Sequence, residues 1–133
     1  MKSIGTIKKY INGLPHYAKV EIEIIPETDQ IEVIEECCGD GWISQGHIEE
    51  VAAQGYEDWK QGAIDGVIYA LKKSGHQHKV QINRITGMAT DTNPDIIFCA
   101  ASHAVWDALE YEPDLNSKKE IENILKNSWN KYR

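Results

Sequence analysis

Alternating apolar and polar residues in the first third of the chain predict three β-strands. Residues 4–11 favour β-structure, and residues 12–15 are rich in turn formers. Over residues 16–24, apolar side chains take every second position and charged side chains the positions between, which is typical of a strand with one buried and one solvated face. Residues 30–37 form a third expected strand. Because short turns join these segments, we expect them to pair as an antiparallel meander.

A long amphipathic helix is expected at residues 46–74. Ser44 is expected to cap its start, and Gly75 can adopt the left-handed conformation that ends a helix. An amphipathic helix of this length needs an apolar surface to cover, so we expect it to pack on the sheet. Its apolar side chains recur at spacings of three and four, which places them along one face: Ile48, Val51, Ala52, Tyr56, Trp59, Ala63, Val67 and Leu71.

The next segment predicts one more strand and a second helix. Residues 78–86 alternate again, and residues 87–93 are expected to form a polar loop. Asn93 and Pro94 suit the cap and the first turn of a helix that extends to residue 109. Because more than half of the circumference of this helix is apolar, we expect it to be mostly buried.

The C-terminal residues predict a final amphipathic helix. Ser117 and Glu120 have the spacing of a capping box. We treat residues 112–133 as a helical appendage on a single domain with its core at about residues 4–111, since 133 residues suffice for one core. The order βββαβα plus a C-terminal helix predicts an α+β fold: a two-layer sandwich with a four-stranded, mainly antiparallel sheet and helices on one face.

The composition is that of an acidic globular protein. Hydrophobic residues make up 41% of the chain and charged residues 26%, without a biased tract, which argues against disorder. The net charge of −7 argues against a surface that holds phosphates by bulk attraction and favours a basic partner. No apolar run reaches the length of a signal peptide or a membrane span, so we expect a cytoplasmic protein without a membrane partner.

The histidines and cysteines form no recognisable catalytic or metal-binding motif. His76 and His78 are two residues apart, which matches no tight zinc motif. We therefore predict no metal site and no cofactor, while metal binding by this histidine pair stays open. Cys37, Cys38 and Cys99 are odd in number and are expected to be reduced. Since no nucleophile, base and oxyanion-binding group share a motif, we expect a non-catalytic protein.

Several short motifs follow one another in an order known from another protein. A tyrosine, an alternating apolar run and a closing proline occupy residues 16–26, and Asp91 lies in the loop after the fourth expected strand. Glycines and small residues stand between and after them: Gly41-Trp42-Ile43, Gly55, Gly62, Gly66, Gly87 and Ala100-Ala101-Ser102. Over about residues 16–109 the chain resembles domain IV of translation elongation factor G.

The resemblance implies a fold and a class of partner. Domain IV of elongation factor G has the ribosomal protein S-five domain 2-like fold, which contains a βαβ unit. Ribonuclease P protein subunits and some small-molecule kinases share this fold, so the fold alone does not assign a function. In the elongation factor, two tip loops reach the decoding centre of the ribosome. The corresponding segments of this chain are residues 12–15 and 87–93.

This chain also departs from the elongation factor. The first tip loop has no arginine, and the second is shorter and lacks the histidine of the family. No glycine-rich loop followed by lysine and serine or threonine occurs, so the chain is not by itself a GTP-driven translocase.

Two functions are compatible with these observations, and neither predicts an oligomeric state. The first is a stand-alone elongation factor G domain IV-like protein that binds the ribosome or structured RNA through tip-loop residues Asn12, Gly13, Gly87, Asp91 and Asn93. The second is an acidic module of the inhibitor or immunity type that masks a basic protein through the sheet face with Glu21, Glu23 and Glu32. A basic edge beside the second tip loop would favour RNA, and a continuous acidic face would favour protein.

Overall fold

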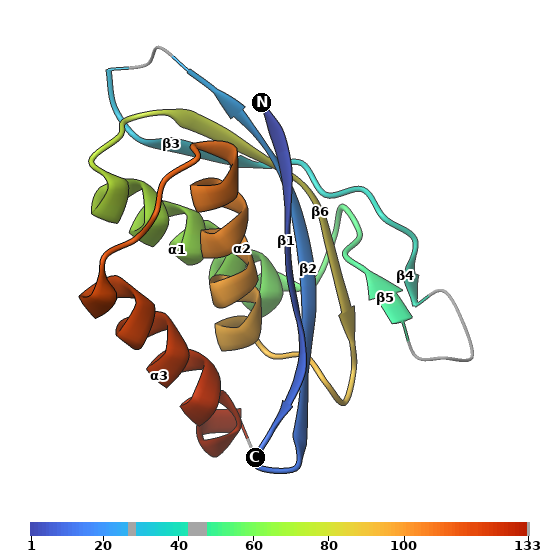
Figure 1. Ribbon diagram of the computed structural model, residues 1–133. Helices are drawn as coiled ribbons and strands as arrows, with labels where there is room; N and C mark the ends of the chain where they lie inside the picture. The colour runs from blue at the N-terminus through green and yellow to red at the C-terminus, as the bar shows by residue number, and fades with distance from the viewer. Residues whose placement is uncertain (27–28, 43–47, 133) are drawn as a thin grey trace.

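In the computed structural model, which describes residues 1–26, 29–42 and 48–132, a six-stranded sheet carries the helices on one face (Figure 1). The opposite face of the sheet is not covered by a helix (Figure 1). The α+β class predicted from the order of elements is confirmed, whereas the expected count of four strands is too low.

The two longest strands form a hairpin at one edge of the sheet. β1 (Lys2–Ile11) and β2 (Leu14–Ile25) pair antiparallel, and Asn12 and Gly13 form the turn with φ angles of 52° and 77°. A two-residue hairpin turn of this kind needs left-handed φ at both positions, and Asn-Gly adopts them most readily. Alternate residues of β2 are buried, as the sequence pattern predicts.

The centre of the sheet is β6 (Lys79–Met88), which pairs antiparallel with β2 on one side. Two short strands share its other side. β3 (Glu32–Glu35) runs parallel to the first part of β6, and β5 (Ile48–Glu50) runs antiparallel to its end. β4 (Gly41–Trp42) pairs with β5 and completes the strand order. The β4–β5 pair therefore extends the sheet sideways (Figure 1).

The expected antiparallel meander of three strands is wrong. The third predicted strand is shortened to β3 and lies beside β6, parallel to it, rather than beside β2. Alternation along a sequence specifies which face of a strand is buried, but not which strand lies beside it. The long connection from β3 to β6 contains β4, β5 and α1, and a crossover of this length allows two strands to pair in parallel.

The long predicted helix is α1 (Glu57–Ser74), which begins later than expected and ends where predicted, at Gly75. The expected first turns are instead β5 and a loop, in which Gly55 and Tyr56 have φ angles of 83° and 57°. Two successive left-handed residues prevent a right-handed helix from continuing through them. Ser44, the expected cap, lies outside the described residues.

The second helix is α2 (Pro94–Ala108), and its predicted start is confirmed. The side chain of Asn93 accepts a hydrogen bond from the backbone N–H of Ile96 at 2.9 Å, and Pro94 occupies the first turn. Most residues of α2 are buried, as expected from its apolar circumference.

The helix expected near the C-terminus is α3 (Leu115–Tyr132), which packs on α2 and on the β1–β2 hairpin. Its cap is the carboxylate of Asp114, which accepts from the backbone N–H of Ser117 at 2.7 Å, so the capping box expected at Ser117 is wrong. The indole N–H of Trp129 donates to the carbonyl of Pro15 at 2.8 Å. The inward stripe of α3 consists of buried apolar residues: Ile121, Leu125 and Trp129.

Glycines let α2 lie against both of its main neighbours at close range. A Cβ added to Gly66 of α1 would overlap the carbonyl oxygen of Phe98 in α2, and one added to Gly5 of β1 would overlap that of Ala100. The hydroxyl of Ser102 donates to the carbonyl of Gly66 at 2.9 Å across the helix pair. The core is therefore built around α2, with backbone packed directly against backbone.

The substitution Gly66→Ala is expected to lower the free energy of unfolding by a net value of about 1–3 kcal/mol, because α1 must move away from α2. The gain in helix propensity, about 1 kcal/mol, is included in this value. Urea unfolding measures the change. Lys72→Ala, at an exposed position of the same helix, is the control and should change stability by less than about 0.5 kcal/mol. An unchanged or raised urea midpoint for Gly66→Ala would contradict the close contact.

Candidate functional site

The two segments expected to act as tip loops lie at the same end of the molecule (Figure 1). One is the turn between β1 and β2, and the other connects β6 to α2. The backbone N–H of Tyr17 donates to the carbonyl of Asp91 at 2.8 Å, and the hydroxyl of Thr92 donates to the carbonyl of Tyr17 at 2.6 Å. The second loop is thus fastened to β2 close to the first.

The five predicted tip residues divide into accessible and structural positions. Asn12 and Gly13 are exposed at the hairpin turn, and Asp91 is half-buried. Gly87 is a buried residue of β6, where an added Cβ would lie 2.8 Å from side chains of α1 and of the following loop. Asn93 is 3% exposed, and its side chain caps α2. The accessible part of the two loops is therefore smaller than expected.

Two lysines and two tyrosines lie beside these loops on the open face of the sheet. We name this set the Lys–Tyr patch: Lys8, Tyr10, Tyr17 and Lys19. Lys8 pairs directly with Tyr17 across the hairpin, and Lys19 pairs with Thr86 of β6. Tyr10 is 76% exposed, while burial raises the pKa of Tyr17 above its usual 10.0. None of the strand residues paired with the patch carries a carboxylate.

Sequence analysis missed the Lys–Tyr patch, although its signal is present. Lys8 and Tyr10 are two residues apart in one strand, as are Tyr17 and Lys19 in the next, so each pair shares a face. The Asn-Gly turn between the strands brings the two pairs together.

The open face of the sheet is mixed in charge rather than continuously acidic. Arg84 lies 3.5 Å from the carboxylate of Glu21 and 3.9 Å from that of Glu50. The strand register places a lysine opposite each of the other two expected acidic residues, in the pairs Lys2–Glu23 and Lys79–Glu32.

Nearly half of the acidic residues belong to one continuous segment. Residues 27–59 contain ten Asp and Glu and no Lys or Arg, whereas the rest of the chain contains 11 Asp and Glu and 14 Lys and Arg. This segment includes β3, β4, β5 and the start of α1, and its strands lie on the far side of β6 from the β1–β2 hairpin. The net negative charge is thus concentrated toward one edge of the sheet, across β6 from the β1–β2 hairpin that carries the Lys–Tyr patch.

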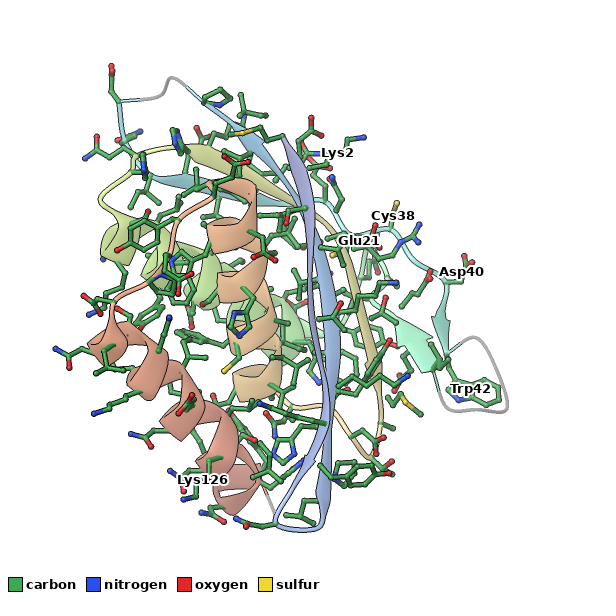
Figure 2. The ribbon with its side chains drawn as sticks, in the orientation of Figure 1. Lys2, Glu21, Cys38, Asp40, Trp42 and Lys126 are labelled. Carbon is green, nitrogen blue, oxygen red and sulfur yellow. The ribbon has the colours of Figure 1, made fainter. Side chains whose placement is uncertain are left out.

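The β4–β5 pair forms an arm on the acidic side, here defined as residues 39–42 and 48–51. Trp42 is 58% exposed, and its side chain projects away from the sheet (Figure 2). The base of the arm is fastened, because Gly39 donates to the carbonyl of Val51 at 2.9 Å and Val51 donates to β6. A large aromatic side chain is therefore held in solvent by a fixed piece of sheet.

An ion pair between a buried lysine and a half-buried glutamate stabilises the chain at the base of the arm. The ammonium of Lys60 lies 3.6 Å from the carboxylate of Glu35 and donates to the carbonyl of Ala53 at 2.8 Å. Glu35 also accepts from the backbone N–H of Cys37 at 2.7 Å. Burial, with the nearby Glu35 charge, raises the pKa of the Cys37 thiol to about 12, so this thiol stays protonated and is a poor nucleophile.

The remaining histidines and cysteines form no metal or redox centre within the residues described. The rings of His76 and His78 stack at 5.3 Å, but no group of three or more His, Cys, Asp and Glu side chains there is arranged to hold a metal ion. The thiols of Cys37, Cys38 and Cys99 are free. Burial raises the pKa of Cys99 to about 12.

None of the helices in the described part of the chain combines the length and the apolar character that crossing a bilayer requires.

Comparison with known proteins gives the fold alone. No protein-family model and no curated protein matches the chain. Of solved structures, 41 chains are similar in fold. One of them is a crystal structure of a protein from Thermus thermophilus, with a TM-score of 0.61 and 17% sequence identity. The match covers 83% of this chain but only 16% of the Thermus chain.

The substitution Glu35→Ala is expected to lower the free energy of unfolding by about 3 kcal/mol, because it leaves the buried Lys60 ammonium without a carboxylate. Lys60→Met removes the buried charge instead of leaving it unpaired, so it should lower the free energy of unfolding by less than Glu35→Ala does. Chemical unfolding compares the two variants, with Glu36→Ala as an exposed neighbouring control. Equal losses for Glu35→Ala and Glu36→Ala would contradict a stabilising ion pair.

Proposed function

We propose that this chain is a non-catalytic protein of the elongation factor G domain IV type that binds the ribosome or structured RNA in the cytoplasm. The observation that carries the proposal is the convergence of both tip loops and the Lys–Tyr patch at one end of the molecule. The sequence resemblance over about residues 16–109 also supports it. So does the β3–α1–β6 unit with its parallel strands, since a βαβ unit belongs to that domain type.

The chemistry of the Lys–Tyr patch suits RNA. Lysine side chains contact phosphates and release counterions, while exposed tyrosine rings stack on unpaired bases. The charge distribution removes the main objection to RNA binding by a protein with a net charge of −7. The strands of the acidic segment lie across β6 from the patch. Most of the negative charge is therefore distant from RNA bound at the patch.

Lys8→Ala combined with Lys19→Ala is expected to weaken ribosome binding and to reduce the dependence of log affinity on log salt by about 2, one for each lost phosphate contact. Co-sedimentation on sucrose gradients at several salt concentrations measures both quantities. Tyr10→Ala should cost about 1–3 kcal/mol of binding with little change in salt dependence.

The matched control for the lysine variants is Lys72→Ala, which removes an exposed lysine from α1, away from the patch. Wild-type protein that stays at the top of every gradient would overturn the proposal. Equal losses for the patch variant and the Lys72 control would instead indicate nonspecific charge attraction.

A second candidate function is supported by the arm. Its acidic surroundings fit an inhibitor or immunity type of module that masks a basic protein. Exposed tryptophan is frequent among the residues that dominate binding energy at interfaces. Within the described residues, β4 is the outermost strand on this side of the sheet, a position to which a partner strand can add.

Trp42→Ala is expected to weaken the capture of a basic partner by about tenfold or more, because the anchor that it removes is exposed and makes little contribution to the core. The measurement is the titration of a captured basic protein against wild-type and variant chains by calorimetry. Tyr10→Ala, an exposed aromatic on the opposite side of the sheet, is the control and should have no effect. Equal affinities for wild type and Trp42→Ala would exclude the arm as the binding surface.

A further inference from the structure

A crevice with a volume of about 360 Å³ lies between β1, α2 and α3, apart from the Lys–Tyr patch and the arm. Its volume is at the lower end of the range of about 300–1,000 Å³ for small-molecule sites. Buried apolar side chains from two helices form its floor: Trp106, Ile121 and Leu125. The space therefore suits a small ligand with an apolar part.

The walls of the crevice are held by contacts that involve several of its polar groups. The indole N–H of Trp106 donates to the carbonyl of Ala70 at 3.1 Å, and the hydroxyl of Tyr111 donates to the carbonyl of Lys73 at 3.2 Å. At the mouth, the ammonium of Lys118 pairs with the carboxylate of Glu112. The first two contacts fasten the α2 side of the crevice to α1, and the ion pair ties the start of α3 to the preceding loop, so these groups are not free to bind a ligand.

Lys9 is a polar residue of the crevice that is not engaged in such contacts with the described residues. This residue comes from the helix-covered side of β1, where its alternate neighbours Ile7 and Ile11 contribute to the core. Lys8 faces the opposite side of the same strand. Among the described residues, Lys9 forms no ion pair, so its ammonium is available at the wall.

His103 lies near Lys9 on the α2 wall. Its burial and the Lys9 charge lower the pKa of His103 below 6.5, although the carboxylate of Asp107 opposes this shift. At pH 7 the imidazole is therefore neutral and can donate one N–H. Asp107 follows one helical turn later, and Glu122 contributes a second carboxylate from α3.

We propose that this crevice binds a free α-amino acid with an apolar or aromatic side chain. Lys9 and His103 receive its carboxylate, Asp107 and Glu122 receive its ammonium, and the side chain lies on the apolar floor. Two carboxylates disfavour a simple anion, and the unpaired lysine disfavours a simple cation, so a zwitterion fits the available charges best. This site is independent of the proposed RNA binding.

The test uses the full chain and three related probes at pH 7: phenylalanine, phenethylamine and phenylacetate. Phenylalanine is expected to give saturable ¹H–¹⁵N shift changes confined to residues that line the crevice. Each of the other two probes lacks one charge and should bind at least about tenfold more weakly, which corresponds to about 1.4 kcal/mol.

Two single substitutions separate the charges. Lys9→Met should weaken phenylalanine and phenylacetate while leaving phenethylamine unchanged, and Asp107→Asn should weaken phenylalanine and phenethylamine while leaving phenylacetate unchanged. Lys8→Met is the matched control, because it removes the adjacent lysine from the other face of β1. All three positions are exposed, so dispersed amide spectra should confirm folded variants.

Several results would overturn the proposal. The first is the absence of saturable shifts with phenylalanine up to its solubility limit. The second is equal binding of all three probes, which would indicate an apolar hollow without charge recognition. The third is an equal effect of Lys9→Met and Lys8→Met. The Lys9→Met variant should co-sediment with ribosomes as the wild type does, because the crevice and the Lys–Tyr patch are separate sites.

Discussion

The close packing of α2 against α1 and β1 is the contact on which the rest of the structure depends. Gly66 and Gly5 bring backbone to backbone on two sides of α2, because an added Cβ at either position would overlap the α2 backbone. The hydroxyl of Ser102 adds a hydrogen bond to the carbonyl of Gly66. Interiors packed at this density resist deformation. The sheet and α1 therefore form a rigid layered body, and α3 covers part of the remaining side of α2.

Three separate surfaces are built on this rigid body. The hairpin and the β6–α2 loop define one end, the arm extends from the side of β6, and the crevice remains where α3 only partly covers α2. Charge distinguishes the first two. The segment of residues 27–59 contains no Lys or Arg, and its strands lie across β6 from the Lys–Tyr patch. A net charge of −7 is thus a poor guide to the potential at either surface.

Local features of the sequence determined much of the secondary structure. The alternation in β2, the Asn12-Gly13 turn, the Asn93 cap of α2 and the Gly75 end of α1 were all predictable. Each depends on φ preferences or hydrogen bonds within a few residues of one another. The α+β class and the side of the sheet on which helices lie follow from the same patterns.

Tertiary structure alone decided the strand partners and the surfaces. Residues 48–51 have helical spacing, yet Ile48–Glu50 forms a strand that pairs with β6. This pairing is a long-range contact, which the local spacing of apolar residues does not specify. Likewise β3 lies beside β6, and Gly87 and Asn93 are buried although both were predicted in an accessible loop. The Lys–Tyr patch and the crevice combine residues from different strands and helices. A sequence pattern specifies which side of an element is apolar, but long-range packing selects its neighbours, and these sites depend on the neighbours.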